Sequence, residues 1–252
     1  MPLISAIIIT LNEEANIAGC LDSVAFCGER IVVDSGSTDA TVEIARRKGA
    51  RVEHHDWQGY GAQKNFALSL ATGDLVLSID ADETVTPELQ AAIRSAIAAG
   101  RADGFEVSRL SSFCGRTMRH SGWYPDYVLR LFRRGKARFD DALVHERVIC
   151  EGSVGRLTPA LQHAPVVRLE DALSRLDRYS TAKAQMLLDR GRRVTFLTGI
   201  GHGVFAFFRT YVLRQGFRDG REGFLLAVLN AENSYYPYMK AWLMQRRRAT
   251  RH

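Results

Sequence analysis

The stretch LVLSIDADE, residues 75–83, is an apolar run that ends abruptly in three carboxylates. This pattern predicts a buried strand that delivers Asp80, Asp82 and Glu83 to its carboxyl end, where open α/β sheets bind their ligands. Asp80 and Asp82 are spaced to approach one cation, and such oxygen ligands suit Mg²⁺ or Mn²⁺ bound to substrate phosphates. Acidic pairs at strand ends are also typical of helix caps, so the surrounding sequence must distinguish the two interpretations.

Upstream of this stretch, predicted strands and helices alternate. Strands are predicted over residues 4–10, 30–34 and 50–53, and helices over residues 13–24, 41–48 and 63–71. This alternation predicts an α/β fold: a three-layer sandwich around a mostly parallel sheet. Thr10, Asp34 and Asp80 would then lie together at the carboxyl ends of neighbouring strands.

Downstream, the pattern changes twice. A helix is expected over residues 87–99, followed by strands over 104–110, 127–133, 135–139 and 143–149, with a loop over 111–126. From Leu169 the chain is expected to be helical to its end. We therefore expect a catalytic domain over residues 1–165 and a basic, helical, membrane-associating region over residues 166–252.

Charge is distributed unevenly along the 252 residues, whose 46% hydrophobic content suffices for a sizeable core. The formal net charge is +6, and residues 166–252 hold 16 Lys/Arg against 7 Asp/Glu. A basic surface of this kind implies an anionic partner, which is nucleic acid, a phosphorylated glycan or membrane headgroups.

The apolar run over residues 196–213 is interrupted by glycines, His202 and Arg209. A spanning helix needs roughly 20 predominantly apolar residues, so an element lying on a membrane fits this run better. Helices that simply pack on the catalytic domain are the alternative. The first apolar run, residues 3–9, lacks a preceding basic region, and the four cysteines lack close pairs, so reduced thiols and a cytoplasmic location are expected.

A second candidate site lies at residues 34–39, DSGSTD, which join a strand to a helix. Gly36 permits a tight turn, and a helix N-terminus with small hydroxyl side chains can receive polar or anionic nucleotide groups. An ordinary helix cap explains Ser37 and Asp39 equally well, but not a carboxylate at Asp34 beside residues 10–13, TLNE. Adjacent histidines on an extended segment point to opposite sides, so His54 and His55 receive no role.

Four of these blocks together resemble glycosyltransferase family 2. They are residues 7–13 (IIITLNE), 32–39 (VVDSGSTD), 64–65 (KN) and 80–82 (DAD), which occur in the family's order and spacing. The resemblance covers residues 1 to about 150 and implies a GT-A fold, a nucleoside-diphosphate sugar as donor and an inverting, metal-dependent mechanism.

Further blocks resemble the bacterial lipopolysaccharide core β-1,4-glucosyltransferase branch of that family. They lie at residues 59–65, 122–127, 129–135, 144–146, 178–180 and 216–224, and so span nearly the whole chain. This resemblance implies transfer of a hexose, with UDP-glucose the best candidate donor, to an anionic lipid-linked glycan of the lipopolysaccharide inner core. Together with the basic, apolar C-terminal region it leads us to expect peripheral contact with the inner face of the cytoplasmic membrane. Another polysaccharide or lipid acceptor stays open.

The family resemblance also implies residue roles. The residues expected around the uridine diphosphate are Thr10, Asn12, Glu13, Asp34 and Lys64, with Asp80 and Asp82 at the donor and at a Mg²⁺ or Mn²⁺ ion. An inverting displacement needs a carboxylate to accept the acceptor's hydroxyl proton. The commoner family pattern has a Glu-Asp pair where this chain has His145-Glu146, so Glu146 is favoured as base, with Asp126 as the alternative.

Trp123 and Tyr124, in a loop flanked by glycine and proline, are candidates for stacking on a sugar ring, although aromatic residues more often belong to a core. Anionic acceptor groups could contact a set of arginines that equally suits a solvated face: Arg116, Arg119, Arg130, Arg133 and Arg134.

Three other classes of protein fit the sequence less well. A nucleotidyltransferase would be expected to carry a glycine-rich basic loop after the first strand, which TLNE is not. A non-catalytic module that binds glycan or membrane would leave Asp80, Asp82 and Glu146 without a role. The acidic strand ends would repel the phosphates of a nucleic acid, so nucleic acid is not expected as a partner.

Overall fold

A computed structural model of the chain describes residues 2–140, 147–166 and 168–249. It divides into two compact units. Unit 1 comprises Met1–Arg109 and Asp126–His163, and unit 2 comprises Leu110–Pro125 and Ala164–His252.

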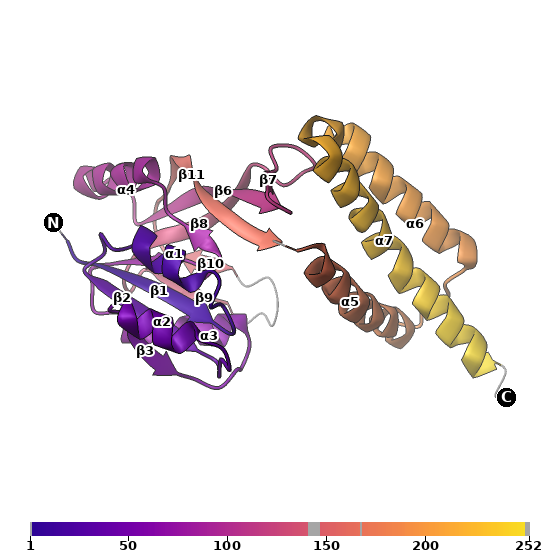
Figure 1. The fold of residues 1–252 in the computed structure, drawn as a ribbon, viewed down its shortest axis with the longest axis horizontal. Coiled ribbons are helices and arrows are strands. Elements are labelled where there is room, and N and C mark those ends of the chain that lie inside the picture. Colours follow the sequence, from indigo (N-terminus) through magenta and orange to yellow (C-terminus); the bar gives the residue numbers. More distant parts are fainter. Residues whose placement is uncertain (1, 141–146, 167, 250–252) are drawn as a thin grey trace. The chain divides into compact units, whose positions relative to one another are not determined.

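The N-terminal part of unit 1 is a parallel sheet (Figure 1). Its strands, in the spatial order β3-β2-β1-β4, are β3 (Arg51–His54), β2 (Glu29–Asp34), β1 (Ile4–Thr10) and β4 (Leu75–Ser78). Thr10 lies opposite Asp34 in the register of β1 and β2. Ile79, the residue before Asp80, donates its backbone N–H to the carbonyl of Ile7 on β1, which confirms the expected grouping at the carboxyl ends of the strands.

Beyond β4 the sheet becomes antiparallel, so it is mixed as a whole. The next strands are β8 (Asp126–Arg133), β6 (Gly104–Phe113), β11 (Val154–Val166) and β5 (Glu83–Thr84), with β7 (Arg116–Thr117) paired to β6. Strands β9 (Ala137–Phe139) and β10 (Val148–Cys150) form a separate antiparallel pair. The sequence did not predict β11, because Pro159 and Pro165 argue against a strand there.

Helices cover both faces of the parallel strands. The first face packs against α1 (Ile17–Ser23), α2 (Thr41–Arg47) and α4 (Pro87–Ala99), and the second against α3 (Tyr60–Leu70) together with β9. Along β1, Ile4, Ala6 and Ile8 belong to the first core and Ile7 to the second. A parallel strand buried on both faces is apolar at most positions, which explains why this run is nearly continuous in apolar residues rather than alternating.

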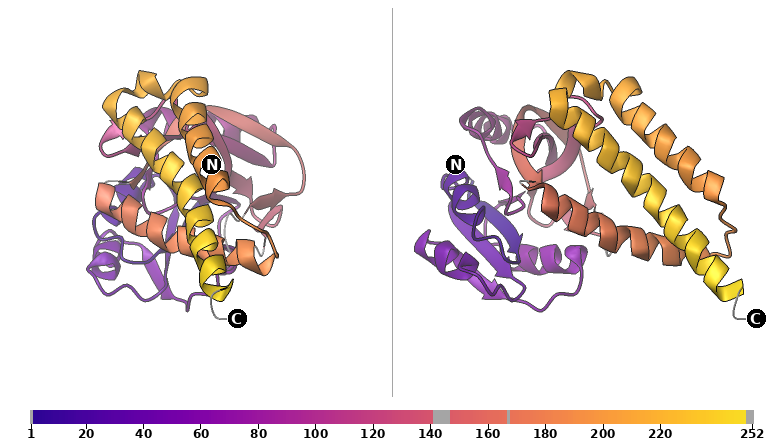
Figure 2. Two further views of the ribbon diagram at one scale, coloured as in Figure 1. Left: turned by 90° about the vertical axis from the view of Figure 1, so that its right-hand side faces the viewer. Right: turned by 45° about the vertical axis from the view of Figure 1, so that its right-hand side comes forward.

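Unit 2 is mainly helical, as expected for the chain after Leu169. Its helices are α5 (Leu169–Asp189), α6 (Phe196–Phe208) and α7 (Gly220–Ala249), with a π-helical turn η1 (Arg209–Leu213) and a 3₁₀ turn η2 (Gly216–Asp219) between the last two. Helices α6 and α7 lie side by side and run in opposite directions, as the views of Figures 1 and 2 agree.

The segment Leu110–Pro125 groups with the helices of unit 2, although the sequence suggested only a loop within the first domain. The buried carboxylate of Asp219 accepts hydrogen bonds from the backbone N–H groups of Arg119 (3.1 Å) and His120 (3.0 Å) and from Ser121 Oγ (2.9 Å). Met118 packs in one apolar cluster with residues of α5 and α7. These contacts join partners about 100 positions apart, which local patterns do not predict.

All four cysteines are free, in agreement with the prediction of reduced thiols. Cys20 and Cys27 are buried, and burial raises the pKa of the Cys27 thiol to about 12.

Candidate functional site

Hydrogen bonds join the loop that follows β1 to the loop that follows β2. Asn12 donates its backbone N–H to Ser37 Oγ (2.8 Å), and its side-chain oxygen accepts the N–H of Thr38 (2.8 Å). Glu13 donates its backbone N–H to Thr41 Oγ1 at 2.7 Å. These bonds hold both loops at the carboxyl end of the sheet without any ligand, which limits the conformational entropy that a ligand would have to remove.

Asp34 shapes the second of these loops. Its carboxylate accepts the backbone N–H groups of Gly36 and Ser37, both at 2.9 Å, and Ser37 Oγ at 2.5 Å. Gly36 has a φ of +99°, a conformation that L-residues rarely adopt. Asp34 therefore has a local structural role at this strand end, and any contact with a nucleotide is made by a carboxylate already fixed in place.

Thr10 presents a buried hydroxyl beside Asp34. Thr10 is 5% exposed, and within the described chain its Oγ1 has no hydrogen-bond partner. A buried polar atom without a partner costs roughly 1–3 kcal/mol. A polar group of a bound ligand would remove this cost, which makes Thr10 the strongest single indication of a binding site between β1 and β2.

Gln63 anchors α3 to this side of the sheet, a role that the sequence did not reveal. It is fully buried and donates Nε2 to Ser35 Oγ and to the carbonyl of His55, both at 2.8 Å. His55 contacts Gln63 Oε1 through Nδ1 at 2.7 Å, so this histidine has a structural role. The next residue, Lys64, is thereby directed toward the end of β4.

Asp80 lies between two cations. Lys64 Nζ is 2.8 Å from its Oδ1, and Arg130 Nη2 is 2.5 Å from its Oδ2. Burial acts to raise the pKa of Asp80, but Arg130 and then Lys64 outweigh it and hold this pKa well below its usual range. Asp80 is therefore charged, with both oxygens engaged by cationic side chains.

Glu83 completes this ion-pair cluster. It is fully buried, accepts the backbone N–H of Asp80 at 2.9 Å and lies 2.5 Å from Arg130 Nη2. Burial raises the pKa of Glu83 despite the adjacent guanidinium. Arg130, which the sequence suggested as an acceptor contact or a solvated residue, is instead 5% exposed and joins two carboxylates. The sequence did contain an indication of this buried role, because Arg130 lies within an otherwise largely apolar strand.

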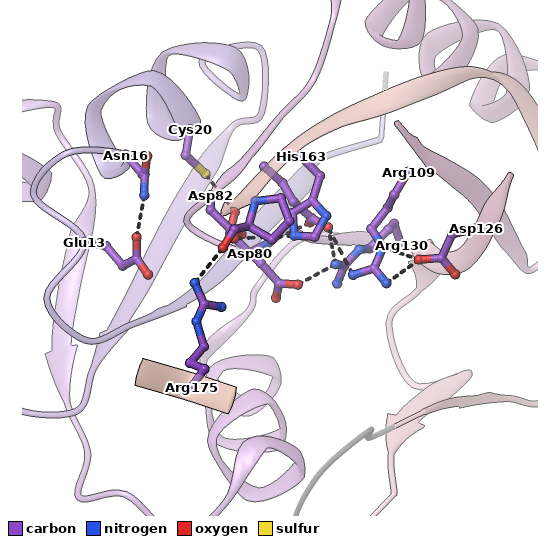
Figure 3. A network of polar contacts seen from close by, with 12 residues as sticks. Glu13, Asn16, Cys20, Asp80, Asp82, Arg109, Asp126, Arg130, His163 and Arg175 are labelled. Atoms are coloured by element: carbon purple, nitrogen blue, oxygen red, sulfur yellow. Dashed lines mark hydrogen bonds and ion pairs between the residues drawn. The ribbon is translucent and has the colours of Figure 1, made fainter. Parts of the chain in front are cut away.

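Asp82 has a different neighbour, His163 on β11. His163 Nε2 lies 3.4 Å from Asp82 Oδ2, and the two side chains are 13% and 24% exposed (Figure 3). The pairing of β11 with β5 brings them together, since His163 lies opposite Glu83 in that register. No local pattern could have linked residues so far apart in sequence.

Asp82 and His163 together fit a divalent cation. Two ligands of one Mg²⁺-sized ion lie roughly 3 Å apart, because each is about 2.1 Å from the metal. Within the part of the chain that the structure describes, no group of three or more His, Cys, Asp or Glu side chains could hold a metal. Asp82 and His163 could hold a cation whose remaining positions are open to phosphate oxygens and water. Asp80, the other predicted ligand, has both carboxylate oxygens engaged by Lys64 and Arg130.

The two candidate bases differ in what the structure shows of them. Asp126 accepts hydrogen bonds from Arg109, through Nε at 2.8 Å and through Nη2, while Arg109 Nη1 lies 3.9 Å from Glu83. Glu146, with its neighbour His145, lies outside the described residues.

The residues suggested for acceptor binding are mostly engaged locally. Trp123 packs edge-on against Phe113, with ring centroids 5.9 Å apart, in an apolar cluster of unit 2, which supports a core role for this ring. Three of the arginines contact their own unit: Arg116 lies 3.8 Å from Glu222, Arg133 lies 3.7 Å from Asp103, and Arg134 donates to the carbonyl of Gly73 at 2.8 Å.

Comparison with known proteins identifies relatives over nearly the whole chain. Residues 5–153 match the family model described as "Glycosyl transferase family 2". The chain is 33% identical to "Lipopolysaccharide core biosynthesis glycosyltransferase LpsC" of Rhizobium meliloti, over 96% of this chain and 92% of that protein. It is 32% identical to an "Uncharacterized glycosyltransferase" of Rickettsia felis, over 92% of this chain and 86% of that one.

Solved structures match a smaller part. Glucosyl-3-phosphoglycerate synthase of Mycobacterium tuberculosis, in a complex with Mn²⁺, UDP and glucosyl-3-phosphoglycerate, is 30% identical over 44% of each chain, with a TM-score of 0.38. TarS of S. aureus is 20% identical over 73% of this chain and 40% of its own, with a TM-score of 0.47.

Proposed function

The chain belongs to glycosyl transferase family 2, and from this premise we propose that it transfers a hexose from a UDP-sugar to a lipid-linked glycan with inversion at the anomeric carbon. The observation that carries the proposal is the arrangement at the end of β4, where Asp82 and His163 lie 3.4 Å apart beside the cationic side chains of Lys64 and Arg130.

This arrangement suits the departure of a nucleoside diphosphate. Breaking a sugar–phosphate bond develops negative charge on the leaving group, and positive groups fixed nearby stabilise that charge in the transition state. A divalent Mg²⁺ or Mn²⁺ ion held by Asp82 and His163 would supply Lewis-acid stabilisation of the diphosphate. Lys64 and Arg130 are already paired with Asp80 and Glu83, so the divalent cation would supply the uncompensated positive charge at this edge of the sheet.

The nucleotide half of the donor is assigned to the ends of β1 and β2. The orphaned hydroxyl of Thr10 would gain a partner from the uridine, and Asp34 sits in register beside it. Asn12 and Glu13 act by fixing the loops that border this site.

The base is assigned to Glu146, with Asp126 as the alternative. Asp126 would have to release Arg109 before it could accept the proton of an acceptor hydroxyl. Glu146 follows the order of blocks expected for the family, so we propose it as the carboxylate that an inverting displacement requires.

The acceptor is proposed to be an anionic, lipid-linked glycan of the lipopolysaccharide inner core, with UDP-glucose as donor. The relative LpsC, which is described as a lipopolysaccharide core biosynthesis glycosyltransferase, supports this acceptor class. The protein would then work at the cytoplasmic face of the inner membrane. Another lipid or polysaccharide acceptor is the alternative, as is a module that binds glycan without catalysis.

A panel assay tests the proposal. Purified full-length protein with Mn²⁺ is offered each of several UDP-hexoses, with and without core glycolipids of defined truncation, and released UDP is measured. We expect acceptor-dependent release that is greatest with UDP-glucose and is abolished by a chelator. Nuclear magnetic resonance of the product should give the anomer opposite to that of the donor. Absence of UDP-sugar binding and turnover with both Mg²⁺ and Mn²⁺ would refute the assignment.

The same assay separates the candidate bases. If Glu146 is the base, Glu146→Gln should lower transfer by at least about 100-fold while leaving UDP binding unchanged. Asp126→Asn should then have a much smaller effect, and the reverse order would assign the base to Asp126.

A further inference from the structure

Helix α6 buries small residues and exposes large apolar ones, which is the reverse of a helix in an ordinary soluble domain. Its buried positions include Gly199, Gly203 and Ala206. A Cβ atom at Gly203 would lie 3.2 Å from Tyr235 Cβ on α7, and one at Gly199 would lie 2.2 Å from Met239 Cε. The small residues therefore form the contact with α7, and the large apolar residues are left on the other side.

Large residues of α6 are exposed, and together with exposed apolar residues of η1, η2 and the start of α7 they make up the set that we call the outer apolar face. Leu197 is 74% exposed, Val204 65% and Phe205 57%. The full set is Phe196, Leu197, Ile200, Val204, Phe205, Phe208, Val212, Leu213, Phe217 and Phe224. Along α6 these residues follow helical spacing, at positions 197, 200, 204 and 208, so they share one side of the helix.

The surface around this face is cationic. Residues 190–221 contain seven arginines, all exposed: Arg190, Arg192, Arg193, Arg209, Arg214, Arg218 and Arg221. The same segment has one carboxylate, Asp219, which is 3% exposed and bonded to residues 119–121. Asp189 and Glu222 border this segment, so its seven exposed arginines outnumber the carboxylates beside them, and they flank the apolar side chains at both ends of α6.

We propose that α6, η1 and η2 lie in the headgroup layer of an anionic membrane, with the outer apolar face inserted and the flanking arginines bound to lipid phosphates. Large apolar side chains combined with flanking Arg suit the interface between headgroups and acyl chains. A second copy of this chain would meet the same arginines with its own, so charge favours anionic lipid as the occupant. The proposed function enters this inference at one point: a protein held at the membrane surface would reach a lipid-linked acceptor there.

An interfacial position fits better than a spanning one. Among the described residues, one helical stretch, Phe196–Leu213, is long and apolar enough to cross a membrane by length and composition, and 22% of it is buried. Arg209 is exposed inside that stretch, four residues before its end, and a charge within the hydrocarbon layer is costly. At the surface, the same arginine would reach the phosphates.

Vesicle flotation with the full-length protein tests the apolar part. Vesicles of phosphatidylcholine alone are compared with vesicles that also contain phosphatidylglycerol, and we expect binding to the anionic vesicles. The triple variant Leu197→Glu, Val204→Glu and Phe208→Glu should lose at least tenfold in partitioning. The matched control is the triple variant Leu173→Glu, Tyr179→Glu and Met186→Glu on α5. These three residues are 44%, 56% and 50% exposed and lie outside the outer apolar face, and this variant should bind nearly as well as the wild type.

A second set of variants tests the charge. Replacing Arg209, Arg218 and Arg221 by Ser should also weaken binding at least tenfold, because each arginine near an anionic surface contributes about fivefold. The control removes the same charge from unit 1, through Arg46→Ser, Arg47→Ser and Arg101→Ser at exposed positions, and should bind nearly as well as the wild type.

Circular dichroism is used to check that each variant is folded, and UDP binding is measured on the same preparations. Vesicle binding without UDP binding would support this inference while counting against the proposed function, so the two can fail separately. The inference is overturned if anionic vesicles are not bound, or if the glutamate triple variant binds them as well as its control does. It is also overturned if light scattering reports a dimer that the triple variant dissociates, with no vesicle binding by either form.

Discussion

Asp80 and Asp82 are two positions apart, yet their neighbours differ in kind. Asp80 contacts Lys64 and Arg130, whereas Asp82 contacts His163. A carboxylate between two cations is held in its charged form and serves to position them, while one beside an imidazole is suited to share a metal. The residues around each carboxylate, more than its place in the motif, set its role.

The metal assignment predicts the effect of removing either ligand. Asp82→Ala and His163→Ala should each lower Mn²⁺ affinity and UDP-sugar turnover by about 100-fold or more, because each removes one of two protein ligands. Calorimetric titration with Mn²⁺ and the UDP-release assay measure both quantities. Glu43→Ala, at an exposed carboxylate on α2, is the control. Full activity in Asp82→Ala would reject the site.

The buried ion pairs predict a large loss of stability when the cation is removed. Arg130→Met should lower the free energy of unfolding by about 3–5 kcal/mol, because it removes the 2.5 Å partner of the buried Glu83 carboxylate and leaves Arg109 at 3.9 Å. Adding Glu83→Gln should recover a substantial part of this loss. Urea denaturation measures both, and Arg156→Met, which breaks an exposed pair with Glu106, should have little effect. Equal effects of Arg130→Met and Arg156→Met would contradict the prediction.

At the scale of elements, close backbone contacts fix the junction of η2 and α7. A Cβ atom at Gly223 would lie 2.0 Å from the carbonyl oxygen of Gly216, and backbone cannot move aside as a flexible side chain can. The turn between the two long helices therefore depends on a missing side chain at one position.

Gly223→Ala should accordingly destabilise the protein by about 1–3 kcal/mol. Gly201→Ala provides the contrast, because a Cβ atom at Gly201, which lies in α6, would meet no other atom within 4 Å. That change should stabilise the helix by roughly 0.5–1 kcal/mol. Chemical denaturation of both variants checks the opposite signs, and destabilisation by both would indicate a cause other than the contact with Gly216.

A carboxylate also ties three elements of unit 1 together. Glu29 Oε2 on β2 accepts Ser5 Oγ of β1 at 2.5 Å, and the N–H and Oγ1 of Thr72, after α3, at 3.0 and 3.1 Å. Burial acts to raise the pKa of Glu29, but the hydrogen bonds from Ser5 and then Thr72 lower it below 4.5. At pH values just below the ordinary pKa of glutamate, the Glu29 carboxyl therefore binds fewer protons in the native protein than in the unfolded chain.

This sign fixes the pH dependence. The stabilising contribution of Glu29 should be fully present above pH 4.5 and be lost as the pH falls through the lowered native pKa. Glu29→Gln should reduce stability at neutral pH and flatten the acid limb of the stability curve, measured by urea denaturation between about pH 3 and 7. An unchanged acid limb would show that the hydrogen bonds do not favour the charged form.

At the scale of the molecule, the GT-A fold implied by the family resemblance is confirmed, with its helical C-terminal region, and the site residues that the structure describes belong to unit 1. Positive charge is concentrated instead in the last third of the chain, most of which lies in unit 2. Donor binding and membrane binding are thus assigned to separate units, which makes them separable by experiment.

UDP should therefore stabilise the protein in a metal-dependent manner. At a UDP concentration 100 times its Kd, with Mn²⁺ present, binding adds about 2.7 kcal/mol to the stability of the native state. Differential scanning calorimetry should show a raised Tm with UDP and Mn²⁺ together, and little change with UDP and a chelator or with Asp82→Ala. An equal shift without metal would argue that the diphosphate is bound by Lys64 and Arg130 alone.

The sequence by itself determined the parallel strands, most helices and the meeting of Thr10, Asp34 and Asp80 at one edge. The strands and helices follow from local periodicity and capping, and the meeting of the three residues follows from the alternation of strands and helices, which makes the strands parallel and brings their carboxyl ends to one edge. The helix over residues 87–99 shows this well, since Pro87 starts it, Thr86 caps it and Gly100, in a left-handed conformation, ends it.

Only the tertiary structure decided which side chains complete the site. His163 reaches Asp82 through the pairing of β11 with β5, and Arg130 reaches Asp80 from the neighbouring strand β8. Likewise, Asp219 brings residues 119–121 into unit 2 from about 100 positions away. Such contacts arise from strand pairing and buried charge compensation between distant segments, and these depend on the whole folded arrangement rather than on any local pattern.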